Sequence, residues 1–335
     1  MINIYDLWFS NLDICNKTKI KLMDKFGDTK NIWSFKRIDL SDYEDFDDKT
    51  IVKIFDEKSK INLEKYVNYL ENKNIKLISY KDDIYPTSLN NIFDKPAFLY
   101  IRGNTQNLYM QNVAIVGSRN ASYYGKNVAR KISREIADKN VNIVSGLALG
   151  IDKYAHLGAL DSKIGNTIAV LGTGVADEEF YPLENKKVFD RILENKGTII
   201  SEYKIGTKPK RYNFPYRNRI ISMFSDAVAV IEAKKKSGTL ITTDYALKYG
   251  KEIFAVPGRV SDILSEGCNE LIKSGAYILT EAEDMLFATG VYFDDKKKKK
   301  RKNKKILLEK ENEVVYSCLD LLPQSINEIV EKTGI

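Results

Sequence analysis

Hydrophobic and polar residues alternate along most of this chain in a way that predicts strands followed by helices. Almost continuously apolar runs recur from residue 112 onward, and amphipathic stretches such as 122–139 and 151–162 fill most of the gaps. This alternation is typical of a parallel sheet with helices on both faces. We therefore predict an α/β fold with an extended Rossmann-like, doubly wound, mainly parallel sheet. The expected strands are NVAIVGS (112–118), VNIVSG (141–146), TIAVLGTG (167–174), TIISEY (198–203), AVAVIEA (227–233), EIFAVPG (252–258) and AYILT (276–280).

The segments before this alternation have a different pattern. Apolar residues at helical spacing predict helices over 4–12, 17–27 and 62–73, with the acidic stretch Asp39–Asp48 between the last two. Residues 1–74 are thus expected to form a small α-helical N-terminal domain. Short strands punctuated by turns are predicted at 77–80, at Tyr85-Pro86 and over 96–103. We assign residues 75–290 to the Rossmann-like domain.

The C-terminal part begins with a run of basic residues. Lys296–Lys305 holds nine positive charges and no acidic residue, and we interpret 291–306 as a lysine-rich linker. Two helical patterns follow, ENEVVYSCLDLL and SINEIVEKTGI, which resemble the first two helices of a winged helix-turn-helix. Residues 307–335 are therefore expected to be the start of a winged-helix-like module. Its recognition helix and wing are missing, so the module is either truncated or vestigial.

Charge and composition limit the function classes. The net charge is +7, and subtracting the nine charges of the lysine run leaves about −2, so any binding surface in the core must be a local patch. No run approaches the roughly 18 apolar residues of a membrane span, and the N-terminus lacks the order of a signal peptide. The three cysteines lie far apart. We predict a soluble, cytoplasmic protein with no membrane contact, no disulfide framework and no metal site.

Two loops after predicted strands contain groups that bind phosphate. Gly117-Ser118-Arg119 follows the first core strand and precedes a helix; glycine permits close approach, serine donates, and a helix N-terminus favours anions. Arg119 adds a fixed charge, although the loop is also an ordinary strand-to-helix turn. Ser237-Gly238-Thr239 follows another strand, after three lysines. Its hydroxyls are suited either to a phosphate or to capping the next helix.

The most informative segment is Lys204–Arg219, which we call the basic–aromatic segment. It has six basic residues, no acidic one, and three interleaved aromatic residues. Positive charge follows a phosphate backbone, and aromatic faces stack unpaired bases at about 1–3 kcal/mol each. Pro215 marks a helix start, so Arg217 and Arg219 are expected in its first turns. The alternative is a solvated loop in which one of these arginines pairs with an internal carboxylate such as Glu202.

Residues for acid–base catalysis are scarce. The glycines of Ser145–Asp152 suit close approach either to a ligand or to the first loop. His156, the only histidine, is expected to be packed or hydrogen-bonded on a helix rather than to act as a base. The chain contains no P-loop, no metalloprotease motif and no nucleophile elbow. We predict no catalytic residues and no cofactor.

These motifs, in this order, resemble the DNA-processing protein A (DprA/Smf) family. The resemblance runs from about Leu77 to Asp284 and rests on AIVGSRNASYYG, VSGLALGIDKYAHLGAL, VLGTG, FPYRNRII, SGTLITTDYALKYGKEIFAVPG and GCNELIKSGA. It implies a non-catalytic homodimer that binds and protects single-stranded DNA and loads RecA recombinase, in natural transformation, in DNA recombination or in both. It also implies that Arg119 contacts phosphate and that Arg211 and Phe214 contribute.

Pattern and resemblance together define a candidate nucleic-acid-binding set: Gly117, Ser118, Arg119, Lys210, Arg211, Phe214, Arg217, Asn218, Arg219, Ser237, Gly238 and Thr239. The chain departs from the family in its incomplete tail and in the Cys15-Asn16-Lys17 connection, which lacks the glycine of DNA-binding helical hairpins. The second departure favours a packing role for the N-terminal helices over direct DNA contact.

The main alternative is an enzyme. The same superfamily includes the Lonely Guy-type nucleotide phosphoribohydrolases, which use a P-G-G-x-G-T-x-x-E loop. The comparable stretch here, 235–244, lacks the tandem glycines and the glutamate, so Asp244 would have to substitute. A protein-interaction scaffold is a weaker alternative, because it leaves the basic–aromatic segment unexplained.

Overall fold

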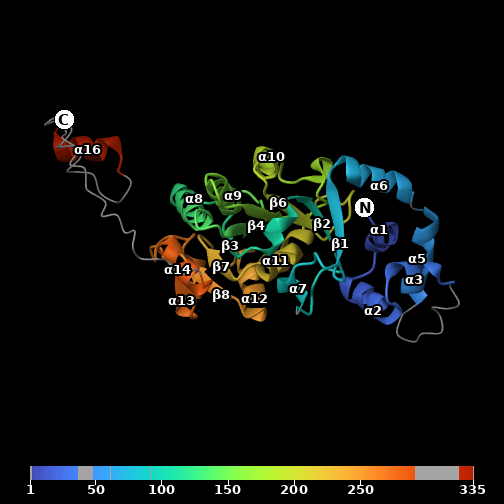
Figure 1. The fold of residues 1–335 in the computed structure, drawn as a ribbon. Coiled ribbons are helices and arrows are strands. Elements are labelled where there is room, and N and C mark those ends of the chain that lie inside the picture. The colour runs from blue at the N-terminus through green and yellow to red at the C-terminus, as the bar shows by residue number, and fades with distance from the viewer. Residues whose placement is uncertain (1, 37–47, 61, 91, 291–323, 335) are drawn as a thin grey trace. The chain divides into compact units, whose positions relative to one another are not determined.

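The computed structural model describes residues 2–36, 48–60, 62–90, 92–290 and 324–334 (Figure 1). The chain divides into two compact units, Met1–Tyr292 and Phe293–Ile335. In the described residues, no helix combines the length and the apolar character that crossing a membrane requires.

A nine-stranded sheet runs through the first unit in the order β1-β2-β6-β5-β4-β3-β7-β8-β9 (Figure 1). Strands β3 to β9 pair in parallel, and β1 and β2 add antiparallel pairs at the β6 edge. Strands β3 to β7 are buried along their whole length, as expected for apolar strands covered on both faces. The strands are β1 (Ile75–Ser79), β2 (Phe98–Gly103), β3 (Asn112–Val116), β4 (Asn142–Ser145), β5 (Thr167–Val170), β6 (Thr198–Ser201), β7 (Ala227–Val230), β8 (Glu252–Ala255) and β9 (Tyr277–Ile278).

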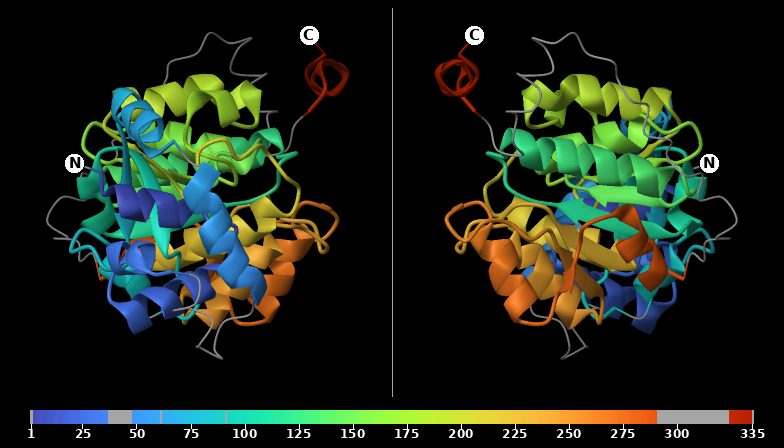
Figure 2. Two further views of the ribbon diagram at one scale, coloured as in Figure 1. Left: turned by 90° about the vertical axis from the view of Figure 1, so that its right-hand side faces the viewer. Right: turned by 90° about the vertical axis from the view of Figure 1, so that its left-hand side faces the viewer.

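Helices cover both faces of this sheet. Figure 2 shows the green helices on one side of the strands and the gold helices, with α13, on the other. The first layer contains α8 (Tyr123–Ala137), α9 (Ile151–Leu160) and α10 (Lys186–Glu194). The second contains α7 (Thr87–Asn90), α11 (Asn213–Phe224), α12 (Leu240–Lys248) and α13 (Glu266–Lys273), and α14 (Ala282–Ala288) follows β9. The predicted doubly wound α/β fold is confirmed.

The order of the strands reverses between β3 and β7. From β3 the chain adds β4, β5 and β6 on one side, and then returns through α11 to place β7 beside β3. The loops after β3 and β7 therefore flank a topological switch point, where a crevice opens at the carboxyl ends of the strands. These two loops carry Gly117-Ser118-Arg119 and Ser237-Gly238-Thr239.

The N-terminal helices pack against the antiparallel edge of the sheet. Their core contains the buried residues Trp8, Leu22 and Ile54, and it includes Phe98 of β2. The helices are α1 (Ile4–Asn11), α2 (Asn16–Phe26), α3 (Thr29–Ser34), α5 (Asp48–Lys60) and α6 (Leu63–Asn72). Three of these were predicted, whereas α3 and α5 were not. The boundary at residue 74 stays a prediction.

One predicted strand is wrong. Tyr85-Pro86 forms a bend before α7, and Tyr85 points into the core, where its hydroxyl donates to the carbonyl of Pro96 at 2.7 Å. The side chain is only 2 % exposed. The apolar residue at this position therefore reflects a single buried aromatic ring and not a strand.

In the second unit, the described element is α16 (Ile326–Thr333). A capping box begins it, because Ser325 Oγ accepts from the backbone N–H of Glu328 and the Glu328 carboxylate accepts from that of Ser325. The helix predicted from the pattern SINEIVEKTGI is confirmed. The lysine-rich segment and the helix predicted over 311–322 lie outside the described residues.

Candidate functional site

A cleft of about 630 Å³ opens at the switch point of the sheet. It is lined by the loops after β3 and β7, by the first turns of α11, and by residues after β4 and β5. Lys210 and Arg219 are not among the lining residues. The structure brings the other ten predicted residues together there: Gly117, Ser118, Arg119, Arg211, Phe214, Arg217, Asn218, Ser237, Gly238 and Thr239.

The loop after β3 is fixed by its backbone. Ser118 donates its N–H to the carbonyl of Glu232 at 2.8 Å and accepts from the N–H of Ile151 at 3.1 Å. Gly150 has a φ of +75°, and a Cβ there would overlap the carbonyl oxygens of Ser118 and Arg119. The glycine is therefore needed for packing between two loops, which is one of the two predicted uses. Arg119 extends from this rigid loop and is exposed.

The N-terminus of α8 already carries an internal anion. Ser122 Oγ accepts from the N–H of Gly125 at 3.0 Å, and the Glu232 carboxylate accepts from the N–H of Ser122 at 2.9 Å and from its hydroxyl. Glu232 is only 4 % exposed. A buried carboxylate at a helix start satisfies free N–H groups and the helix dipole. Any phosphate in the cleft would thus depend on side chains such as Arg119 rather than on this helix.

A second buried carboxylate lies at the start of α9. Asp152 accepts from the N–H groups of Gly146 and Ala148 at 3.1 and 3.4 Å. Burial raises its pKa, and the nearby Arg217 guanidinium opposes that rise. Arg217 is itself 3 % exposed and donates to the carbonyls of Gly146 and Val170. Burial lowers the pKa of Arg217 to about 10, so it remains a cation beneath the cleft at neutral pH.

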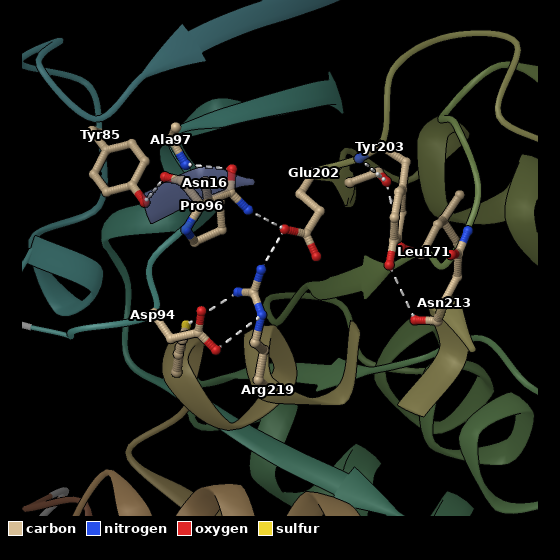
Figure 3. Close-up of polar contacts among 12 residues, drawn as sticks. Asn16, Tyr85, Asp94, Pro96, Ala97, Leu171, Glu202, Tyr203, Asn213 and Arg219 are labelled. Atoms are coloured by element: carbon tan, nitrogen blue, oxygen red, sulfur yellow. Dashed lines mark hydrogen bonds and ion pairs between the residues drawn. The ribbon is translucent and has the colours of Figure 1, made fainter. Parts of the chain in front are cut away.

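Arg219 has a structural position. Its guanidinium is fully buried, pairs with the Glu202 carboxylate, and lies 3.6 Å from a carboxylate oxygen of Asp94 (Figure 3). It also stacks over the Tyr216 ring at 4.2 Å. The structure therefore agrees with the alternative prediction, in which this arginine pairs with an internal carboxylate. We correct its assignment accordingly, because a guanidinium with no solvent exposure is unavailable to a ligand.

The exposed cations and aromatic rings meet at the mouth of the cleft. The Arg119 guanidinium lies 5.7 Å from the Phe214 ring centroid. Phe214 rests on Gly172, where a Cβ would lie 2.9 Å from the ring, and Arg211 is exposed beside it. Lys210 is exposed outside the lining, 5.8 Å from the Tyr212 ring centroid. The predicted pairing of charge with aromatic surface is present at Arg119 and Phe214.

Sequence reasoning missed Tyr181 as a site residue. It follows β5, lines the cleft, is 50 % exposed, and lies 5.9 Å from Phe214 between ring centroids. Lys234 and Lys236 also line the cleft. Their position in the chain could have identified them, because all three residues follow strands that end at the same edge of the sheet.

The hydroxyls after β7 bond to each other. Ser237 Oγ accepts from the N–H of Thr239 at 3.2 Å and donates to its hydroxyl at 3.0 Å. Thr239 precedes α12 but makes no side-chain capping bond. Asp244, the residue that a hydrolase would need, is exposed and does not line the cleft.

His156 is a packed residue, as predicted. It is fully buried, and its Nδ1 lies 2.7 Å from the hydroxyl of Thr167, which itself donates to the carbonyl of Ile143. Thr167 therefore accepts from Nδ1–H. Burial lowers the pKa of His156 to about 3, and Arg217 acts in the same direction. The imidazole is neutral at physiological pH and does not reach the cleft.

Comparisons with known proteins point to one family. Residues 76–290 match the family model described as DNA recombination-mediator protein A. DNA processing protein DprA of Streptococcus pneumoniae is 44 % identical over 208 residues, which cover 62 % of this chain and 72 % of that protein. Protein Smf of Synechocystis is 37 % identical over 274 residues, covering 81 % and 68 %.

Two solved structures are also similar. The crystal structure of DprA from Streptococcus pneumoniae superposes with a TM-score of 0.73 at 34 % identity, covering 85 % of this chain and 98 % of that one. A structure of DNA processing protein A from Helicobacter pylori has a TM-score of 0.57 at 31 % identity, covering 64 % and 94 %. That work describes the single-stranded DNA binding mode of the Helicobacter protein.

Proposed function

This chain belongs to the DNA recombination-mediator protein A family, and from that premise we propose that it binds single-stranded DNA in the cleft at the switch point. The observation that carries the proposal is the meeting of Arg119, Arg211 and Phe214 in one cleft. Two of these side chains are exposed cations, and the third is a half-buried ring.

The chemistry of the cleft favours a single strand over a duplex. Arg119 and Arg211 are suited to phosphate oxygens, and Lys234 and Lys236 add positive charge to the lining of the same cleft. Phe214 presents a ring to which only an unpaired base has access. The binding is expected to be indifferent to base sequence, since these side chains offer charge to phosphates and a ring for stacking.

We also propose that the protein acts by binding and not by hydrolysing nucleotides. Asp152 is the carboxylate that lines the cleft in the described residues, and its Oδ2 accepts from two backbone N–H groups. Its engagement leaves no free general base at the mouth. Incubation with nucleoside monophosphates is expected to release no base, and measurable release would contradict this part of the proposal.

A homodimer that protects the strand and loads RecA recombinase onto it, in transformation or recombination, is the finer part of the proposal. Support for a dimer comes from β9, the described edge of the parallel sheet, where Tyr277 and Ile278 are each 54 % exposed. Unpaired edges with exposed apolar side chains favour self-association. Light scattering is expected to give about twice 38.3 kDa, and Tyr277→Lys should shift the mass toward a monomer.

The central experiment compares single strands with duplexes. Fluorescence anisotropy with the full chain and one labelled oligonucleotide, alone or annealed, is expected to show at least tenfold tighter binding of the single strand. Equal affinity would contradict the cleft assignment, because a charged surface alone attracts both forms. A RecA filament-formation assay on strands coated with a single-strand-binding protein tests the delivery role separately.

A further inference from the structure

One ion pair connects the start of the loop between β6 and α11, residues 202–212, to the helix that follows the loop. Glu202 is its first residue, and Arg219 lies two turns into the helix that follows it. Within the loop, the Tyr203 hydroxyl donates to the carbonyl of Asn213 at 3.4 Å. Figure 3 shows the Glu202–Arg219 pair and the Tyr203–Asn213 bond. The loop carries Arg211, and Phe214 follows directly.

The N-terminal helices contact this loop through neutral and charged groups. Asn16, at the start of α2, donates to the Glu202 carboxylate at 2.8 Å and accepts from the N–H of Ala97 at 3.1 Å (Figure 3). Lys204 donates to the carbonyl of Asn11 at 2.8 Å. Tyr66 of α6 donates to the carbonyl of Ile205 at 3.3 Å. Three nearby positions of the loop are thus attached to three different N-terminal helices.

The same helices hold the loop after β5. Lys73, directly after α6, lies 2.8 Å from the Glu178 carboxylate, which also accepts from the Tyr69 hydroxyl at 3.1 Å. Glu178 lies three residues before Tyr181. The two loops that bring Tyr181, Arg211 and Phe214 to the cleft are therefore both attached to a layer of helices that itself does not line the cleft.

We propose that the N-terminal helices set the affinity for single-stranded DNA by positioning these two loops, with Glu202 as the central positioning residue. The inference rests on the proposed function. A loop with several positive charges repels itself and loses conformational freedom when it binds. Attachment to the helices orders the loop before DNA binds, so less conformational entropy is lost on binding. Glu202 suits this role because its side chain is only 3 % exposed and joins α2, α11 and the loop.

The first test uses two changes that leave the charge of the chain unaltered. Asn16→Ala removes the bonds to the Glu202 carboxylate and to the N–H of Ala97, and Tyr66→Phe removes the bond to Ile205. In the full chain the double variant is expected to bind a labelled single strand about threefold to tenfold more weakly, because the loop must now be ordered on binding. The slope of log affinity against log salt should stay unchanged, since no phosphate contact is lost.

A matched control and a double-mutant cycle separate positioning from general damage. Asn31→Ala removes a similar side-chain bond, to the carbonyl of Phe26, within the N-terminal layer, and is expected to leave affinity unchanged. In an Arg211→Ala/Phe214→Ala background, the Asn16/Tyr66 changes should lose most of their effect. A full effect in that background would overturn the proposal, because independent sites contribute additively.

Hydrogen exchange supplies a readout that needs no DNA. Backbone amides of residues 203–212 should exchange several-fold faster in the Asn16→Ala/Tyr66→Phe variant than in the wild type, while those of α9 stay unchanged. Equal exchange in the loop would overturn the positioning role even if DNA binding is confirmed. Faster exchange in a chain whose wild type fails to bind single strands would instead contradict the proposed function alone.

Discussion

The two halves of the basic–aromatic segment have opposite environments. In the first half, Arg211 is exposed at the cleft, and Phe214 is half-buried beside it. In the second half, Arg217 and Arg219 are 3 % and 0 % exposed. The same residue type therefore has two roles within nine positions. The difference arises because α11 is enclosed by the sheet and its neighbouring helices, so its arginines can be accommodated only with internal partners.

The comparison teaches that partners decide the role of a cation more than the density of charge. Arg219 has the Glu202 carboxylate, and Arg217 has two carbonyl groups and Asp152 nearby. Arg211 lies outside the helix and makes no ion pair among the described contacts. Buried arginines are expected to affect stability, and exposed ones to affect binding and its dependence on salt.

The largest expected effect is on the buried side. Arg219→Ala leaves the Glu202 carboxylate buried without its charge partner, which should cost about 3–5 kcal/mol of the free energy of unfolding. Urea denaturation measures it. Arg134→Ala is the control, because Arg134 lies on the surface of α8, 3.8 Å from Asp138, with 61 % of its side chain exposed. The free energy of unfolding of the Arg134→Ala variant should fall by less than about 1 kcal/mol. Equal urea midpoints for both variants would show that Arg219 contributes no more to stability than an exposed arginine. The distinction between the two halves of the segment would then be lost.

The next largest effect is expected for the half-buried ring of Phe214. Phe214→Ala should weaken single-strand binding by about 1–3 kcal/mol with little change in the salt slope, because stacking carries no charge. Anisotropy titrations at several salt concentrations measure both quantities. Tyr212→Ala is the matched control, since Tyr212 is 67 % exposed but does not line the cleft. A larger loss at Tyr212 would move the binding surface out of the cleft.

A smaller effect is expected for the exposed cations taken singly. Arg119→Ala and Arg211→Ala should each weaken binding to all sequences alike and lower the salt slope by roughly 0.7, the value for one phosphate contact on a single strand. Neither should change the free energy of unfolding by more than about 0.5 kcal/mol, because both are surface residues. An unchanged slope in both variants would show that these arginines do not contact phosphate.

Sequence patterns were sufficient for the centre of the sheet because strands β3 to β7 are short, apolar and buried on both faces, which leaves a local signal. The family resemblance added that Arg119 and Phe214 contribute to one binding site, and the structure places both after strands that end at one edge of the sheet. Tyr181 was missed because its loop has no periodicity and reaches the cleft only through tertiary packing. The burial of Arg219 was not decided either, since its partners Glu202 and Asp94 are distant in sequence.

The smallest effect is expected from deletion of Lys296–Lys305. This deletion tests whether the number of positive charges or the local geometry of the cleft governs binding. This segment lies outside the described residues and holds nine of the positive charges of the chain. If local geometry governs binding, its deletion should cost less affinity than Arg119→Ala, and the preference for single strands over duplexes should be kept. The same oligonucleotide and salt series measure both variants.

The opposite result would change the interpretation of the whole binding surface. Segments of like positive charge attract any nucleic acid through release of counterions, so they add affinity but no preference for unpaired bases. A deletion that removes most of the affinity, while Arg119→Ala and Phe214→Ala bind normally, would place the main site on the lysines. A deletion that weakens single strands and duplexes equally, with the cleft variants still impaired, would instead assign the lysines to attraction and the cleft to discrimination.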